Sequence, residues 1–265
     1  MSFLRIIANT GFQDGVGRST TTAVLAFMLM RHQGLKPLII DLDSKNSQRM
    51  FFQDLKDAQL DYSTEIGNAK LQINRGRIAD LATVGYSLTN QPPIVNTKIF
   101  KLKRYLKSLN YDIILIDTPS TFDTSCMLGF QLADDLNIVC TSGIEGLDQV
   151  ENVLDKLNTL VKDSVLSPSF STITLNGKDV ATYKTDFSYK IKKYYRDFTF
   201  QTILKRRKPI HDYASKGITE RYVNDRKALK DYKELTAEFS KHYKLEHKQG
   251  IFKDKTYTEI LKGTT

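Results

Sequence analysis

A glycine-rich stretch near the start of the chain has the composition of a phosphate-binding loop. It reads Gly11-Phe12-Gln13-Asp14-Gly15-Val16-Gly17-Arg18-Ser19-Thr20, between an apolar run typical of a strand and one typical of a helix. Backbone N–H groups and a helix amino-terminus point at an anion in such a place. Gly15 and Gly17 allow close backbone approach, Arg18 supplies a cation and Ser19 a hydroxyl for Mg²⁺. The stretch matches the usual spacing, G-x-x-x-x-G-K-[ST], only in part. An ordinary glycine-rich turn that binds no phosphate therefore remains an alternative interpretation.

Two apolar runs farther along the chain end in carboxylates. PLIIDLD ends in Asp41 and Asp43, and YDIILID ends in Asp117. The carboxyl ends of parallel strands meet at one edge of a sheet, where ligands bind in this architecture. A hydrated Mg²⁺ and an attacking water both call for carboxylates beside a phosphate loop. One acidic strand end alone is common, but all three with the loop predict a nucleotide site.

The apolar pattern predicts strands that alternate with helices. The expected strands are residues 4–8, 37–42, 111–117, 136–140, 170–175 and 198–204, and the expected helices are residues 19–30, 99–109, 147–161, 187–195 and 226–245. Residues 45–95 show helical patterns interrupted by glycines and by two prolines. This alternation implies an α/β fold, with a mostly parallel central sheet flanked by helices on both faces and a basic helical C-terminal extension. We expect one domain over residues 1–245 and a polar tail over residues 246–265.

Basic charge is concentrated in the last third of this chain of 265 residues, whose formal net charge is +9. Residues 1–150 hold 15 basic and 15 acidic side chains, whereas residues 180–265 hold 21 and 11. Such asymmetry predicts a polyanionic partner, usually nucleic acid, although a solvated lysine-rich surface is the plain alternative. No helix-turn-helix or zinc spacing is evident, so phosphate contacts are expected rather than base reading. The candidate DNA-binding residues are Lys205, Arg206, Arg207, Lys208, Arg221 and Arg226.

The remaining composition narrows the class of protein. Hydrophobic residues make up 40% of the chain, which is enough to bury a core and excludes wholesale disorder. The apolar runs are far shorter than the roughly 20 residues of a membrane span. The segment GIFKDKTYTEILKGTT is too polar for an amphipathic membrane helix, so no membrane partner is expected. Cys126 and Cys140 lie in apolar stretches, which suits a reducing cytoplasm.

The motifs GVGRSTTTAVLA, PLIIDLDSKNS and YDIILIDTPSTF, in this order, resemble those of the ParA/MinD family of deviant-Walker ATPases, in particular the ParA-type partition proteins. Weaker similarity continues through DDLNIVCTSGIEGLDQV, ITLNGKD and FQTILKRRKPIHDYASKGI. The resemblance implies a P-loop fold, ATP and Mg²⁺ as cofactors, a nucleotide-dependent homodimer and nonspecific binding to double-stranded DNA of the nucleoid. It also implies a small centromere-binding or adaptor protein that stimulates the switch, and a role in plasmid or chromosome partition.

The same resemblance assigns roles to single residues. Those that would bind the nucleotide are Gly15, Val16, Gly17, Arg18, Ser19, Thr20 and, at the adenine, Asn176. Ser19, Asp41 and Asp117 would hold Mg²⁺. Asp43 would orient the attacking water beside Asp41 and Arg18, so these three form the expected catalytic set.

Three loop positions depart from the family pattern. Gln13 stands where the signature lysine reaches the partner's nucleotide, and Asp14 replaces the glycine after it. Arg18 keeps the charge of the main lysine but not its reach or geometry. Because a cation on a transferring phosphate stabilises the transition state by several kcal/mol, we expect weak hydrolysis. Three functions stay open: a DNA-associated partition ATPase, a non-hydrolysing DNA-binding adaptor, and a nucleoid-based positioning ATPase for another cargo.

Overall fold

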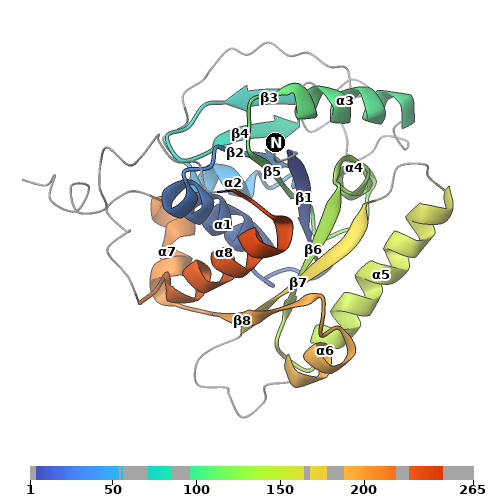
Figure 1. Ribbon diagram of the computed structural model, residues 1–265, viewed down its shortest axis with the longest axis vertical. Coiled ribbons are helices and arrows are strands. Elements are labelled where there is room, and N and C mark those ends of the chain that lie inside the picture. The colour runs from blue at the N-terminus through green and yellow to red at the C-terminus, as the bar shows by residue number, and fades with distance from the viewer. Residues whose placement is uncertain are drawn as a thin grey trace, which may run out of the picture.

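The computed structural model has an eight-stranded sheet in the order β3-β4-β2-β5-β1-β6-β7-β8 (Figure 1). The strands are β1 (Arg5–Thr10), β2 (Pro37–Asp41), β3 (Leu71–Asn74), β4 (Asp80–Val84), β5 (Ile113–Asp117), β6 (Asp135–Thr141), β7 (Ser169–Gly177) and β8 (Thr199–Lys205). All pairings are parallel except that of β3 with β4. The structure describes residues 4–53, 55, 71–84, 96–163, 168–177, 188–218 and 227–246.

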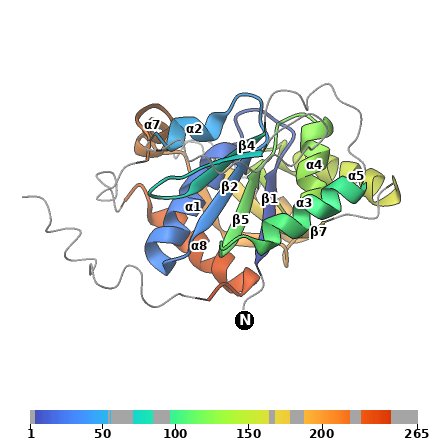
Figure 2. The ribbon, with the colours of Figure 1, turned by 90° about the horizontal axis from the view of Figure 1, so that it is seen from above.

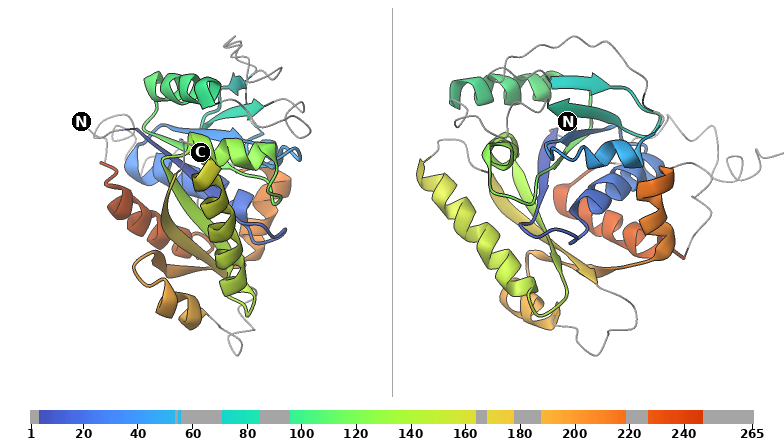
Figure 3. Two further views of the ribbon diagram at one scale, coloured as in Figure 1. Left: turned by 90° about the vertical axis from the view of Figure 1, so that its right-hand side faces the viewer. Right: turned by 180° about the vertical axis from the view of Figure 1, so that it is seen from behind.

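Helices cover both faces of this sheet (Figures 2 and 3). One face carries α1 (Arg18–Gln33), α2 (Ser47–Phe51), α7 (Lys208–Lys216) and α8 (Lys230–Tyr243), and the other carries α3 (Asn96–Ser108), α4 (Thr124–Leu132), α5 (Gly146–Asp163) and α6 (Ser188–Tyr194). Each face has its own apolar core, because alternate residues of the strands point to opposite sides. Leu38 and Ile40 of β2 belong to the core on the side of α3 to α6, whereas Ile39 belongs to the core on the side of α1 and α8. The predicted α/β fold is therefore confirmed.

The strands that meet the candidate site are buried on both sides. All five residues of β2 and of β5 are buried, as expected for central parallel strands covered by helices. Gly17 and Gly34 bound α1 at its two ends, both in the left-handed conformation that favours glycine. The apolar helix α1 is thereby fixed directly after the loop and directly before β2.

The interpretation of residues 45–95 as interrupted helices agrees with α2, Ser47–Phe51, but is wrong for residues 71–84. Residues 71–84 form the strands β3 and β4, of which β4 pairs with the distant β2. Leu71 and Ile73 are buried while Gln72 is exposed, which is the alternation of a strand. Four residues are too few for this pattern to stand out in a sequence. The short helices α4 and α7 were likewise not anticipated.

The C-terminal helix is part of the layered domain. It spans Lys230–Tyr243, within the expected residues 226–245, and packs on both β8 and α1. Leu235 and Phe239 are fully buried in the core of that face. Among the helices that the structure describes, none has the length and apolar character needed to cross a membrane. Most of the expected polar tail, residues 247–265, lies outside the described residues.

A buried polar network lies beneath the start of the glycine-rich loop. Asn137 Nδ2 donates to Asn9 Oδ1 at 2.7 Å, and Asn9 Nδ2 donates to Thr22 Oγ1 at 2.9 Å. The hydroxyls of Thr172 and Thr174 both donate to Asn137 Oδ1 at 3.0 Å. These bonds link β1, β6 and β7 to the first turns of α1. Asn137 is the centre of the network, because it bonds with residues of two other strands, Asn9 of β1 and Thr172 and Thr174 of β7.

We predict that Asn137→Ala lowers the free energy of unfolding by roughly 1–3 kcal/mol, because it leaves buried polar groups without partners. Urea unfolding followed by circular dichroism measures the effect. Asn152→Ala, on the exposed side of α5, is the matched control and should change stability by less than about 0.5 kcal/mol. Equal effects of the two substitutions would contradict the claim that this network stabilises the folded protein.

Candidate functional site

The glycine-rich loop, residues 11–17, joins β1 to α1 at the carboxyl edge of the sheet. Gly15 and Gly17 have φ of 76° and 86°, which only glycine adopts readily. Gly17 is the N-cap of α1, so the loop leads into the amino-terminus of that helix. A Cβ on Gly17 would overlap Asn176 Nδ2, which donates to the Val16 carbonyl at 2.7 Å. The predicted loop and the predicted adenine ligand therefore lie side by side.

The three predicted carboxylates meet beside this loop. β2 and β5 are neighbours, and their register pairs Asp41 directly with Asp117. Asp43 follows two residues later, and its backbone N–H donates to Asp41 Oδ1 at 3.1 Å. All three residues are buried, with exposed fractions of 1% for Asp41, 7% for Asp43 and 0% for Asp117. The sequence prediction that these strand ends converge is confirmed.

Arg18 lies among these carboxylates. Its Nη1 donates to the Gly11 carbonyl at 2.5 Å, across the base of the loop. Its Nη2 lies 3.7 Å from Asp43 Oδ2, and its Nε lies 3.6 Å from Asp117 Oδ1. Only 6% of the residue is exposed. The structure thus brings together Arg18, Asp41 and Asp43, which were expected to form the catalytic set.

Gln48 connects the carboxylates to the loop and was missed by sequence reasoning. Its Nε2 donates to Asp117 Oδ2 at 2.7 Å and to the Ser19 carbonyl at 3.0 Å. Its backbone N–H donates to Asp41 Oδ2 at 2.9 Å, so one residue holds both strand ends. Gln48 is fully buried in the short helix α2. A neutral amide in the polar stretch SKNSQRM carries no spacing signal that could have marked it.

The charge balance of this cluster favours a further cation. Burial, followed by the nearby charge of Asp117, raises the pKa of Asp41 to about 8. Burial also raises the pKa of Asp117 above its ordinary value. Asp117 Oδ1 and Arg18 Nε are buried without a hydrogen-bond partner. The Arg18 guanidinium pairs with Asp43 and Asp117, and the buried Asp117 Oδ1 accepts no hydrogen bond, so this oxygen is available to a metal ion.

Mg²⁺ fits this donor set, because it prefers oxygen ligands. The predicted metal ligand Ser19 opens α1, and its Oγ donates to Ser47 Oγ at 3.4 Å. Within the described residues, no group of three His, Cys, Asp or Glu side chains is arranged to hold a metal ion by itself. Mg²⁺ commonly uses one or two carboxylates and completes its shell with waters and substrate phosphates. The site therefore suits a metal that arrives with a phosphate ligand.

The two unusual loop residues, Gln13 and Asp14, have partners within the same chain. Gln13 Oε1 accepts a hydrogen bond from Gln149 Nε2, and Gln149 Oε1 accepts from the Thr141 backbone N–H at 2.9 Å. Asp14 Oδ1 lies 3.4 Å from Lys45 Nζ. The loop is thus tied on one side to α5 and on the other to the segment after β2. Sequence reasoning singled out neither Gln149 nor Lys45.

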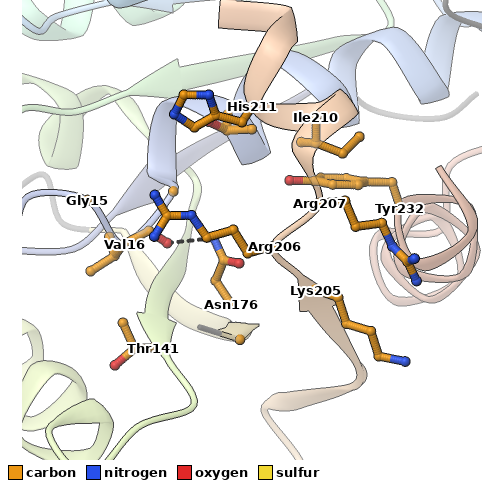
Figure 4. A pocket seen from close by; sticks show the side chains of 13 residues that line it. Gly15, Val16, Thr141, Asn176, Lys205, Arg206, Arg207, Ile210, His211 and Tyr232 are labelled. Atoms are coloured by element: carbon orange, nitrogen blue, oxygen red, sulfur yellow. Dashed lines mark hydrogen bonds between the residues drawn. The ribbon is translucent and has the colours of Figure 1, made fainter. Parts of the chain in front are cut away.

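A cavity of about 290 Å³ adjoins the loop on the side away from the carboxylates (Figure 4). Its lining residues include Gly15, Val16, Gly17, Thr20, Asn176, Lys205, Arg206, Arg207, Ile210, His211 and Tyr232. Arg206 points into this cavity toward Val16, whereas Lys205 and Arg207 point away from it. The cavity therefore combines the loop backbone, a side-chain amide and a cation.

The predicted DNA-binding residues lie in different surroundings in the structure. Arg206 faces the cavity, and Arg207 Nη2 pairs with Asp231 Oδ2 at 3.3 Å. Lys205 lines the cavity edge, while Lys208 is exposed at the start of α7. Arg221 and Arg226 lie outside the described residues. Among the four described members of this set, Arg206 and Lys208 are exposed, whereas Lys205 and Arg207 are half-buried.

We predict that Gly17→Ala distorts the loop more than Gly15→Ala. Both substitutions place a Cβ at positive φ, which costs about 1–2 kcal/mol, but only the Cβ at position 17 would also overlap Asn176. At position 15 no atom lies within 4 Å of the added Cβ. Thermal unfolding and the NMR signal of the Asn176 side-chain amide measure the difference. Equal destabilisation with an unmoved Asn176 signal would contradict the close packing.

Comparison with known proteins agrees with this architecture. A family model described as an AAA domain matches residues 4–167. The sporulation initiation inhibitor protein Soj of Bacillus subtilis is 24% identical over 233 residues, which cover 80% of this chain and 88% of Soj. The septum site-determining protein MinD of Buchnera aphidicola is 22% identical over 156 residues, and this chain spans only 57% of its length.

Solved structures share the fold at low sequence identity. MinD from Pyrococcus horikoshii, complexed with Mg-ADP, has a TM-score of 0.68 at 19% identity, with 90% of this chain and 96% of MinD covered. A candidate plasmid partition protein from Borrelia burgdorferi, bound to AMPPNP, has a TM-score of 0.67 at 20% identity, with 90% and 99% covered. Taken with the family match over residues 4–167, these findings show that the chain belongs to the ParA/MinD family of P-loop ATPases.

Proposed function

We propose that this chain binds ATP together with Mg²⁺ at the loop of residues 11–17 and hydrolyses it slowly. The observation that carries the proposal is the buried cluster of three carboxylates, which has one guanidinium among them and an orphaned Asp117 Oδ1. A glycine loop that opens a helix beside such a cluster suits a triphosphate and its metal. The Mg-ADP and AMPPNP complexes of the structural relatives support the same ligands.

Each part of the site has a task in this proposal. The phosphates would be held by Gly15, Val16, Gly17, Arg18, Ser19 and Thr20. The bound Mg²⁺ would neutralise charge on the phosphates, and Ser19, Asp41 and Asp117 would hold it. Asp43 would orient the attacking water, since the Lys45 backbone N–H, which donates to its Oδ1 at 3.0 Å, fixes that carboxylate. Asn176 and the adjoining cavity would take the nucleoside.

Two features support slow turnover. Gln13 is neutral and hydrogen-bonded to Gln149, so this loop position brings no positive charge to a phosphate. Arg18 is held among Asp43, Asp117 and the Gly11 carbonyl, and it must exchange these contacts for a phosphate. Preorganised cations contribute most when they need no rearrangement at the moment of reaction. The site is therefore better suited to binding than to fast hydrolysis.

At the level of the whole protein, we propose a homodimer that binds double-stranded DNA nonspecifically and acts in partition on the nucleoid. Exposed lysines on the face of α7 and α8 supply the phosphate contacts; they are Lys208, Lys216, Lys227, Lys230 and Lys233. A small centromere-binding or adaptor protein would stimulate the switch. The partition relative from Borrelia supports this role. A nucleoid-based positioning ATPase for another cargo would use the same surface.

A non-hydrolysing DNA-binding adaptor is the second candidate function. The ion pairs of Arg18 with Asp43 and Asp117 favour it, because they already balance part of the charge that a metal would balance. In that case the protein would keep the fold and the basic face but would not use the nucleotide as a switch. Nucleotide-dependent dimerisation, measured by light scattering, separates the two functions.

We expect radiolabelled ATP to bind in the presence of Mg²⁺ and to be hydrolysed slowly, with or without DNA. Asp43→Ala should abolish turnover but retain ATP binding, because Asp43 acts on the water rather than on the phosphates. Asp148→Asn removes an exposed carboxylate of α5 and is the control that should change neither quantity. Fast turnover by the wild type that Asp43→Ala abolishes would contradict the weakened switch. Failure of ATP to bind would favour the adaptor.

We expect affinity for unrelated DNA duplexes to be similar and to fall steeply with salt, because counterions are released. Combining Lys208→Gln, Lys216→Gln and Lys230→Gln should reduce the salt slope by about one for each lost phosphate contact. The control combines Lys98→Gln, Lys101→Gln and Lys107→Gln on α3, at the opposite face. Fluorescence anisotropy measures both. Equal salt slopes for the two triple variants would contradict the assignment of DNA binding to the face of α7 and α8.

A further inference from the structure

Asp14 places a carboxylate in the loop to which we assign phosphate binding. It directly precedes Gly15, and its side chain is 71% exposed, so it lies at the mouth of the loop. A hydrogen bond from Ser120, followed by Lys45, lowers the pKa of Asp14 and keeps the carboxylate charged. An incoming polyphosphate would be repelled by this charge over a Debye length of about 8 Å. The loop therefore needs a compensating cation.

Lys45 brings a cation to Asp14 from a different strand end. Its Nζ lies 3.4 Å from Asp14 Oδ1 and 3.5 Å from Asp14 Oδ2. Its backbone is fixed by the hydrogen bond from its N–H to Asp43 Oδ1 at 3.0 Å. Asn46, the next residue, has φ of 49° and is the N-cap of α2. Lys45 is thus held beside the loop by its backbone, while its side chain stays 64% exposed.

The neighbouring loop side chains contribute less to this task, and the charge of Arg18 is the weakest of the influences on the pKa of Asp14. Arg18 is directed inward, 3.7 Å from Asp43 and 3.6 Å from Asp117, and is buried. Gln13 carries no charge and is hydrogen-bonded to Gln149. The cation 3.4 Å from the Asp14 carboxylate therefore comes from the segment after β2.

We infer that Lys45 is a charge-compensating residue of the phosphate loop, whose ammonium group neutralises Asp14 and so lets an anionic nucleoside polyphosphate bind. The inference rests on the proposed function, because it concerns affinity for the ligand assigned to this loop. Lys45 acts through Asp14 and is a positioning residue, not a catalytic one. The charges of Asp14 and Lys45 then act on binding in opposite directions. Asp14 weakens the binding of the polyphosphate, and Lys45 relieves that effect.

The alternative is that the pair merely fastens the loop to the segment after β2. Fastening and charge compensation predict opposite changes in ligand affinity when Asp14 is removed. If the pair is a fastener, removing either charge loosens the loop and weakens binding. If it compensates charge, removing Asp14 strengthens binding and removing Lys45 weakens it. A double-mutant cycle separates the two.

The test is the affinity for ATP with Mg²⁺, measured by isothermal titration calorimetry at low salt for the full chain. The variants are Asp14→Asn, Lys45→Gln, the combination of both, and the control Lys107→Gln, which removes an exposed lysine at the opposite edge of the sheet. We expect Lys45→Gln to weaken binding and Asp14→Asn to strengthen it, each by about threefold to fivefold, the size typical of exposed charge pairs. Lys45→Gln should have little effect once Asp14→Asn is present, and Lys107→Gln should have none.

Weakening by both single variants would overturn the inference in favour of a fastening contact. An equal loss from Lys45→Gln in both backgrounds would also overturn it, since Lys45 would then contact the nucleotide directly. Wild-type affinity in every variant would overturn it as well. Each of these outcomes leaves the proposed function intact. Absence of ATP binding by the wild type and by Asp14→Asn would overturn the proposed function, and this inference with it.

Discussion

Three carboxylates and a single guanidinium lie buried together at the carboxyl edge of the sheet, and the elements around them are arranged to tolerate these charges. Burying charged groups is costly unless they are paired and hydrogen-bonded. Gln48 donates to Asp117 through its side chain and to Asp41 through its backbone, while Arg18 lies between Asp43 and Asp117. The short helix α2 is positioned by this requirement. Asp117 Oδ1 stays buried without a hydrogen-bond partner, and this is the atom at which we propose that a metal binds with its phosphates.

The loop shows how this chain departs from its family without losing the site. The residue at position 13 is neutral and is tied to α5 through Gln149, and the acidic residue at position 14 is tied to Lys45. Both residues alter the charges that an incoming phosphate meets. The nucleotide site and the basic face of α7 and α8 are joined through α1, which starts at the loop and packs on α8. If the proposed function holds, a weakened loop would weaken the control that the nucleotide exerts over the basic face.

The sequence predicted the features that rest on local chemistry. Apolar runs ending in Asp41 and Asp117 placed both carboxylates correctly, because parallel strands bring their carboxyl ends to one edge. Gln48, Lys45 and Gln149 could not be predicted, because each acts through a partner distant in sequence and has no distinctive spacing. The strands β3 and β4 were missed for a similar reason, since long-range pairing with β2 decides their conformation. Arg207 was predicted to bind DNA, but Asp231, which pairs with it, is 24 residues away.

In the proposed site, Mg²⁺ supplies positive charge to the buried carboxylates. The most direct test is the thermal unfolding midpoint of the protein with ATP, once in EDTA and once with Mg²⁺. A ligand that binds the folded state raises this midpoint according to its affinity. We predict a larger rise with Mg²⁺ than in EDTA, and the loss of that difference in Asp117→Asn. An equal rise in EDTA and in Mg²⁺ would contradict it.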